Sequence, residues 1–268
     1  MNSKSNTQAM ETEKIPRLLA RLAIPAVVAQ IINLLYNIVD RIYIGHIPGV
    51  GAAALTGVGL FTPILMLINA CAMLAGSGGA PRAAISMGKK DNKTAEKILG
   101  NCFVILLLMA VALTVLFFAL APQLLTLFGA SDQTLPYGVD YARIYILGSI
   151  FVLIVMGMNP FITTQGFAKI SMMTTVIGAV INIILDPIFI FVFHLGVKGA
   201  ALATVLSQAV GAIWILRFLS GKKTILHLRK ENFKLQKEIL LPCLALGIST
   251  FVMLSTESIL SISFTSSF

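Results

Sequence analysis

Residues 17–44 read RLLARLAIPAVVAQIINLLYNIVDRIYI, an apolar stretch that contains one acid, Asp40. A helix needs roughly 20 apolar residues to cross a hydrocarbon core about 30 Å thick, and this stretch is long enough. A second acid, Asp186, lies in the apolar sequence INIILDPIFIF, residues 181–191. A carboxylate inside a membrane is costly unless a partner, an ion or a proton compensates its lost hydration. Asp40 and Asp186 are therefore the first candidate functional residues.

Each acid ends a stripe of polar side chains at helical three- and four-residue spacing. The first stripe holds Gln30, Asn33, Tyr36, Asn37 and Asp40. The second holds Ser171, Thr175, Gly178, Asn182 and Asp186. Pro187 removes a backbone donor just after the second acid, so a freed carbonyl can serve as an oxygen ligand there. In lipid these faces turn inward, where they either join helices to one another or form a functional site.

The composition indicates an all-α polytopic membrane protein. Of the 268 residues, 57% are hydrophobic and 12% are charged, and the mean hydropathy is +0.91. A soluble domain of this size needs far less continuous apolar length. Seven segments are long enough to span a bilayer: 17–44, 52–80, 98–121, 138–160, 170–194, 197–220 and one that begins at Ile239. We expect the sequence from Gly76 to Pro81 to make the second span irregular, and Pro122 to close the third.

The chain has a net charge of +9, and the positions of its basic residues indicate membrane topology and not nucleic-acid binding. Lys and Arg lie before the first span and after the second, fourth and sixth spans. The loops after the first, third and fifth spans hold only Lys198. Because positively charged loops stay in the cytoplasm, we predict a multi-pass protein with a cytoplasmic N-terminus and no nucleic-acid partner. The polar start of the chain lacks a signal-peptide pattern, so we expect it to be retained.

Four parts are expected along the chain. Residues 1–16 form a cytoplasmic segment, 17–220 a six-helix transmembrane lobe, 221–238 a cytoplasmic amphipathic linker, and 239–268 the first helix of an incomplete second lobe. The linker, GKKTILHLRKENFKLQKE, mixes basic and apolar residues, which favours a position at the membrane surface. Because the seventh segment has no polar flank on its far side, we expect the chain to be truncated.

The two stripes predict a site for a cation or a proton. Carboxylate, amide and hydroxyl oxygens are hard ligands that suit Na+, and a carboxyl group deprived of water can hold a proton instead. One such acid can therefore exchange a proton for a cation, which is the chemistry of an ion-coupled antiporter. We expect no cofactor besides the coupling ion, H+ or Na+.

Four stretches, taken in order, resemble the N-terminal lobe of MATE (multidrug and toxic compound extrusion) transporters, most closely their DinF and MepA-like bacterial branch. They are LAIPAVVAQIINLLYNIVDRIYIGHI, GAAALTGVGLFTPI, INIILDPIFIF and GVKGAALATVLSQ. The resemblance implies a bacterial inner-membrane protein with twelve helices in two six-helix lobes. It also implies export of cationic or amphipathic small molecules in antiport with H+ or Na+.

The resemblance further implies the residues of a cation site. They are Asp40 and Tyr36 on the first helix, Tyr141 on the fourth, Asn182 and Asp186 on the fifth, and Thr204 on the sixth. Tyr145, one turn from Tyr141, is an alternative on the fourth helix. Na+ would be held by Asp40, Asn182, Asp186 and Thr204. Substrate-cleft candidates are Asn33, Asn37, Gln208 and Glu257, the last of which resembles an acid found in the second lobe of some branches.

Two alternatives remain open, and a third is disfavoured. A lipid-linked oligosaccharide flippase of the same superfamily shares the architecture, although such flippases more often line their cavity with several basic residues. A truncated chain would be nonfunctional unless it associates with itself or with a missing C-terminal lobe. An intramembrane aspartyl protease would need a GxGD-type loop beside one acid, and ILDP at Asp186 lacks it, so we predict that the protein is not an enzyme.

Overall fold

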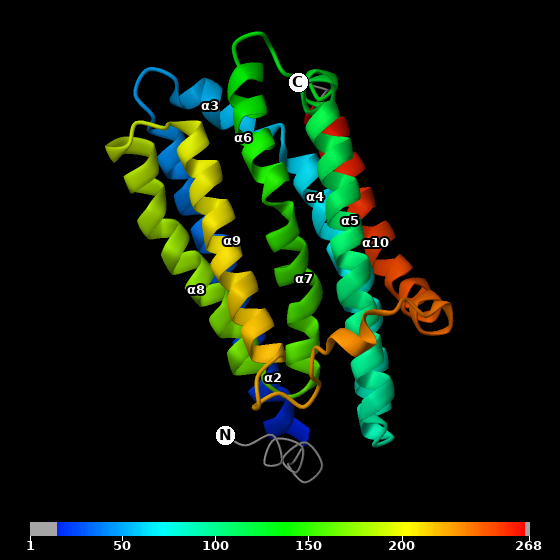
Figure 1. Cartoon of the computed structure of the whole chain (residues 1–268). Helices are drawn as coiled ribbons and strands as arrows, with labels where there is room; N and C mark the ends of the chain where they lie inside the picture. Colours follow the sequence, from blue (N-terminus) through cyan, green and yellow to red (C-terminus); the bar gives the residue numbers. More distant parts are fainter. Residues whose placement is uncertain (1–14, 266–268) are drawn as a thin grey trace.

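The computed structural model describes residues 15–265, and every regular element in this range is helical (Figure 1). The main helices are α2 (Ile15–Gly45), α4 (Thr62–Gly88), α5 (Asn92–Leu127), α6 (Leu135–Leu147), α7 (Ser149–Thr164), α8 (Ala168–Pro187), α9 (Val197–Leu219) and α10 (Lys237–Thr265). The shorter elements are α3 (Gly51–Gly59), the π-helical turn η1 (Ile188–Val192) and the 3-10 turn η2 (Lys230–Phe233). Residues 1–14 of the predicted cytoplasmic segment lie outside the described range.

The described residues contain six helical units that are long and apolar enough to cross a membrane, or seven if one bent pair is counted as a single span. Helices α3 and α4 together form one of the six. The bent pair is α6 and α7, with an angle of 57° between them. The predicted all-helical, multi-pass architecture is therefore confirmed, and the irregular backbone predicted after Asp186 is present as the π-helical turn η1.

Two details of the predicted spans are wrong. The helix continues without a break from Gly76 through Pro81, and the second span is instead interrupted at Leu60 and Phe61, between α3 and α4. Pro122 lies inside α5, which continues to Leu127. A membrane helix tolerates an internal proline because neighbouring groups can satisfy the freed carbonyl. Gly76 serves helix packing: a Cβ there would lie 2.9 Å from the carbonyl oxygen of Gly157 on α7.

The helices form two groups on either side of α6 and α7. In Figure 1, α8 and α9 lie on one side with α2 behind them, whereas α4, α5 and α10 lie on the other. Fully buried side chains fill the space between these groups, including Phe61, Ile68, Leu106, Leu153 and Phe161. Helix α2 packs mainly along α8 and has little contact with α4, so the bundle is open between α2 and α4.

The linker, residues 221–238, is fixed to the six-helix lobe by buried side chains. The Gln165 Oε1 atom, in the turn between α7 and α8, accepts hydrogen bonds from Thr224 Oγ1 at 2.8 Å and from the backbone N–H groups of Ile225 and Leu226 at 2.8 and 2.9 Å. Leu226 is fully buried in the core. Ile225, Leu228 and Phe233 also pack against the core, whereas Leu235 is exposed.

A second set of hydrogen bonds holds the other end of the linker on α5. The Asn101 amide group donates to the carbonyl oxygens of Asn232 and Lys234 at 3.3 and 3.2 Å, and its Oδ1 atom accepts from the Gln236 N–H group at 2.7 Å. The Phe233 ring packs 5.5 Å from that of Phe103. The linker is thus an ordered strap, although most of it is not helical.

Replacing Gln165 by Leu should release the first half of this strap. Leu has a similar volume but cannot accept the two backbone hydrogen bonds, each of which contributes about 0.5–1.5 kcal/mol. We expect the amides of Ile225 and Leu226 to exchange with deuterium roughly tenfold faster in mass-spectrometric measurements. The exposed Gln123 on α5 provides the matched control. Equal deuterium exchange of these amides in Gln165→Leu and Gln123→Leu would contradict the role assigned to Gln165.

Candidate functional site

The two acids of the sequence stripes meet in the interior of the bundle. Asp40 on α2 and Asp186 on α8 lie close to each other, although 146 residues of sequence separate them. The Asn182 amide, one turn before Asp186, donates to Asp186 Oδ1 at 3.2 Å and lies 3.3 Å from Thr204 Oγ1 on α9. The Thr204 hydroxyl donates to the Ala200 carbonyl oxygen at 3.0 Å. Asn182 and Asp186 are fully buried and Thr204 is 6% exposed.

Three buried oxygen atoms at this point have no hydrogen-bond partner. They are Asp40 Oδ1, Asn182 Oδ1 and Asp186 Oδ2. A buried polar atom without a partner costs about 1–3 kcal/mol, and more when it is charged. Buried carboxylates are stabilised by pairing, by metal coordination or by protonation. The arrangement can therefore take up a monovalent cation among its oxygens or hold a proton between the two acids.

Tyrosines surround the two acids. Tyr141 on α6 is 4% exposed and lies beside Asp40 and Thr204. Tyr36, one turn before Asp40 on α2, has Asp40 and Asp186 among its neighbours. Tyr145 is 7% exposed and also lies near Tyr36 and Asp40. The structure thus places both tyrosines considered on the fourth span next to the acids.

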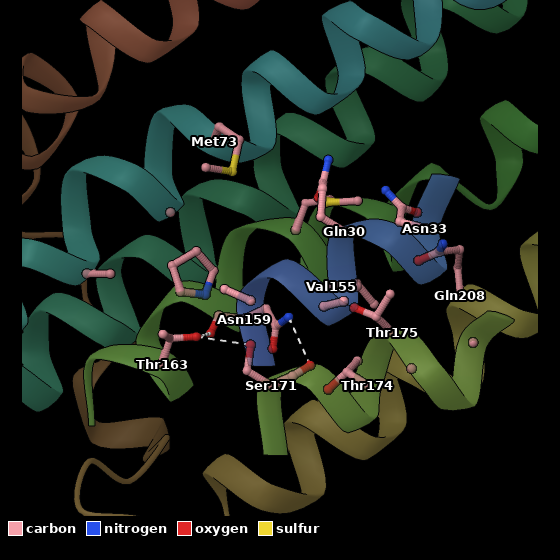
Figure 2. Close-up of a pocket in the computed structure, with 18 of the residues that line it drawn as sticks. Gln30, Asn33, Met73, Val155, Asn159, Thr163, Ser171, Thr174, Thr175 and Gln208 are labelled. Carbon is pink, nitrogen blue, oxygen red and sulfur yellow. Dashed lines mark hydrogen bonds between the residues drawn. The ribbon is translucent and has the colours of Figure 1, made fainter. Parts of the chain in front are cut away.

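A cavity of about 640 Å³ lies next to the two acids (Figure 2). It is lined by α2, α4, α7, α8 and α9, and it includes the open side between α2 and α4. Its polar lining includes Gln30, Asn33, Tyr36 and Gln208, and its apolar lining includes Met73 and Val155. None of the described residues that line it is an Asp, Glu, Lys or Arg. The cavity offers hydrogen-bonding and apolar surface, while the acids lie beyond its lining.

The substrate-cleft candidates separate into two groups. Asn33 and Gln208 line the cavity, and Figure 2 shows both side chains at its α2 and α9 walls. Asn37 is exposed, and its amide donates to the Asn33 carbonyl oxygen at 2.6 Å. Glu257 is exposed on α10, a helix that contributes no residue to the lining. The structure therefore does not bring Asn37 or Glu257 to the cavity.

Sequence reasoning missed a polar cluster at the other end of the cavity. The Asn159 amide donates to the Ser171 carbonyl oxygen at 3.4 Å, and the Thr163 hydroxyl donates to Ser171 Oγ at 3.0 Å (Figure 2). Asn159 Oδ1 is buried without a partner. We interpreted Asn159 and Pro160 as the end of a span, but α7 continues through both to Thr164. An amide one turn before a threonine in an apolar segment was the signal that could have identified this cluster.

Comparison with known proteins places this geometry among transporters. The MatE family profile matches residues 25–188. The chain is 27% identical to the multidrug export protein MepA of Staphylococcus haemolyticus, over 91% of this chain and 53% of that protein. It is 26% identical to MepA of Staphylococcus aureus, over 90% of this chain and 53% of that protein. The chain thus spans about half the length of these relatives.

Solved structures show the same relationship. An outward-facing conformation of a multidrug resistance MATE family transporter of the MOP superfamily superposes with a TM-score of 0.84 at 29% identity, over 90% of this chain and 53% of that chain. An inward-facing conformation gives a TM-score of 0.81 at 29% identity, over 91% and 55%. The fold of this chain therefore corresponds to about half of such a transporter: a six-helix lobe followed by a seventh helix.

Proposed function

The chain belongs to the MatE family, and we propose that it forms the first lobe of a secondary transporter that exports cationic or amphipathic small molecules in antiport with H+ or Na+. The proposal places it in a bacterial plasma membrane with the N-terminus in the cytoplasm, as the charge distribution favours. A second lobe, or a second copy of this chain, would supply the opposite wall of the transport pathway.

The observation that carries the proposal is the set of unpartnered oxygens beside a cavity. Asp40, Asn182 and Asp186 each present one such buried oxygen, and Thr204 adds a hydroxyl within 3.3 Å of the Asn182 amide. An arrangement that served only to join helices would pair these atoms with one another. Unpaired oxygens support a site that binds a small cation or a proton for part of a transport cycle.

Cation binding can be coupled to substrate release through α2. This helix carries Asp40 and also contributes Ala26, Ala29 and Gln30 to the cavity wall. A cation or proton between Asp40 and Asp186 removes their mutual repulsion and favours a closer approach of α2 to α8. That movement would narrow the cavity and lower its affinity for substrate. A ligand shifts such an equilibrium only by its differential affinity for the two states.

Everted membrane vesicles that contain the protein provide the test. With a sodium-rich or acidic interior, these vesicles should accumulate ethidium, because the outward cation gradient drives the exchange. An ionophore that dissipates the gradient should stop the accumulation. Ethidium uptake that is the same with and without a gradient, or the same in vesicles that lack the protein, would contradict the antiport proposal.

The flippase alternative has weaker support. Recognition of a pyrophosphate-linked lipid calls for Arg or Lys side chains in the cavity. The described lining residues include neither, whereas amides, hydroxyls, methionines and prolines are present. This lining fits an amphipathic molecule better than a lipid pyrophosphate.

A further inference from the structure

Three aromatic rings form a buried cluster next to the two acids. Tyr141 and Tyr145 on α6 stack at a centroid distance of 5.9 Å with an interplanar angle of 17°. Phe61 meets both rings edge-on, at 5.7 Å from Tyr141 and 5.5 Å from Tyr145, with angles of 64° and 69°. Phe61 is fully buried, and both tyrosines are at least nine-tenths buried. Stacked and edge-to-face pairs at these distances are the favourable arrangements for aromatic rings.

The break between α3 and α4 puts Phe61 in this position. Tyr141 and Tyr145 lie one turn apart and so share a face of α6. Phe61 lies in the interruption directly before α4. One turn earlier, the backbone of α3 lies against that of α6, because a Cβ on Gly57 would be 2.9 Å from the backbone nitrogen of Gly138. This close approach fixes the position along α6 at which the Phe61 ring contacts the two tyrosines.

Both tyrosines of the cluster lie near Asp40, and Tyr141 also lies beside Thr204. Within the aromatic cluster, Phe61 contacts only the two tyrosine rings. A tyrosine side chain has two rotatable angles, and neighbours on the face and the edge of its ring restrict both. Tyr141 is held in this way by Tyr145 on its face and by Phe61 at its side.

We propose that Tyr145 and Phe61 are positioning residues of the cation site. They hold the Tyr141 ring in the orientation that keeps it beside Asp40 and Thr204. This inference rests on the proposed function for its effect on cation binding. Tyr145 and Phe61 pack behind the side chain that would contact the ion, and packing of this kind fixes the orientation of side chains in binding sites. The ring of Tyr145, and not its hydroxyl group, performs this role.

The proposal predicts different effects for two substitutions at one position. Tyr145→Leu removes the ring that stacks on Tyr141, so the apparent affinity for the coupling cation should fall about three- to tenfold. Tyr145→Phe keeps the ring, so it should lose less of the affinity than Tyr145→Leu does. Phe61→Leu should resemble Tyr145→Leu, because it removes the second restraint on the Tyr141 ring.

The experiment uses the purified full chain in lipid nanodiscs. Thermal stability is followed against NaCl, with choline chloride to hold the ionic strength, and separately against pH from 5 to 9. The control is Phe218→Leu, which removes a ring from a pair of similar geometry, formed by the buried Phe167 and the partly buried Phe218 at 5.2 Å and 72°. The expected result is a cation midpoint that shifts in Tyr145→Leu and Phe61→Leu, shifts less in Tyr145→Phe, and does not shift in Phe218→Leu.

A second measurement makes the proposal testable without cation binding. 3-Fluorotyrosine incorporated at position 141 should give one fluorine resonance in the otherwise unsubstituted protein and in Tyr145→Phe. In Tyr145→Leu the resonance should broaden or split, because the ring gains further orientations. If the protein does not respond to cations but the resonance behaves in this way, the proposed function fails and the positioning role holds. An unchanged resonance in Tyr145→Leu, or equal damage in Tyr145→Phe, overturns the positioning role.

Discussion

Replacing Asp186 by Asn is expected to abolish the stabilisation of the protein by its coupling cation. The amide has the shape of the acid but carries no charge, so it can neither neutralise Na+ nor take up a proton. A cation at 100 times its dissociation constant stabilises a folded protein by about 2.7 kcal/mol, and Asp186→Asn should lose this whole increment. Asp40→Asn should have the same effect, because the two acids act on one ion or proton.

The stability of these variants without the cation should not fall. Asp186 is fully buried and one of its carboxylate oxygens has no partner, so a neutral amide removes a desolvated charge. Thermal unfolding in NaCl and in choline chloride, repeated across pH, measures both effects. The same substitution at Asp140, which pairs with Lys198 at 3.5 Å on half-exposed side chains, is the control. Undiminished cation stabilisation in both Asp40→Asn and Asp186→Asn would remove the basis for the proposed coupling site.

Replacing Gly78 by Ala should destabilise the contact between α4 and α10. A Cβ on Gly78 would overlap the carbonyl oxygen of Cys243, and one on Gly247 would overlap that of Leu74. Both obstacles are backbone atoms, which cannot move aside as a side chain can. We therefore expect a cost of about 1–3 kcal/mol, the usual range for overpacking a close contact.

Gly88, at the end of α4, provides the control substitution for Gly78→Ala. Nothing lies within 4 Å of a Cβ built on Gly88, so Gly88→Ala should leave the stability unchanged or raise it by up to about 1 kcal/mol through helix propensity. Thermal unfolding of the two variants side by side gives the sign of each effect. Equal stabilities would show that α10 does not pack on α4 as closely as these positions indicate.

Helix α10, the last of the described helices, packs on the six-helix lobe through this contact with α4. We expected residues 239–268 to begin a second lobe, and α10 packs along α4, from Gly78 to the hydrogen bond between Ser258 Oγ and the Pro63 carbonyl oxygen at 2.9 Å. The strap is fixed to the six-helix lobe as far as Gln236, directly before α10.

Much of the candidate site could be predicted from sequence because its members repeat along single helices. Tyr36 and Asp40, and likewise Asn182 and Asp186, are four residues apart, so each pair shares a face whatever the tertiary structure. Lipid then requires both faces to turn inward. The same reasoning placed Asn37 at the site, but a helix face about 100° wide does not decide which residue at its margin reaches the cavity. Asn37 lies at that margin and is exposed.

The helical fold, the several membrane crossings and the polar faces of α2 and α8 follow from the amino-acid sequence alone. Those properties depend on composition and on the helical repeat, which are local. By contrast, the contacts of Asn182 with Thr204, of Phe61 with Tyr141, and of Gln165 with the linker are apparent only in the folded chain. These contacts join different helices or loops, and they depend on how closely the backbones approach and where the helices break. The close approach of α4 to α7 at Gly76 and the interruption at Phe61 are two examples, and residue spacing along the chain contains no measure of either.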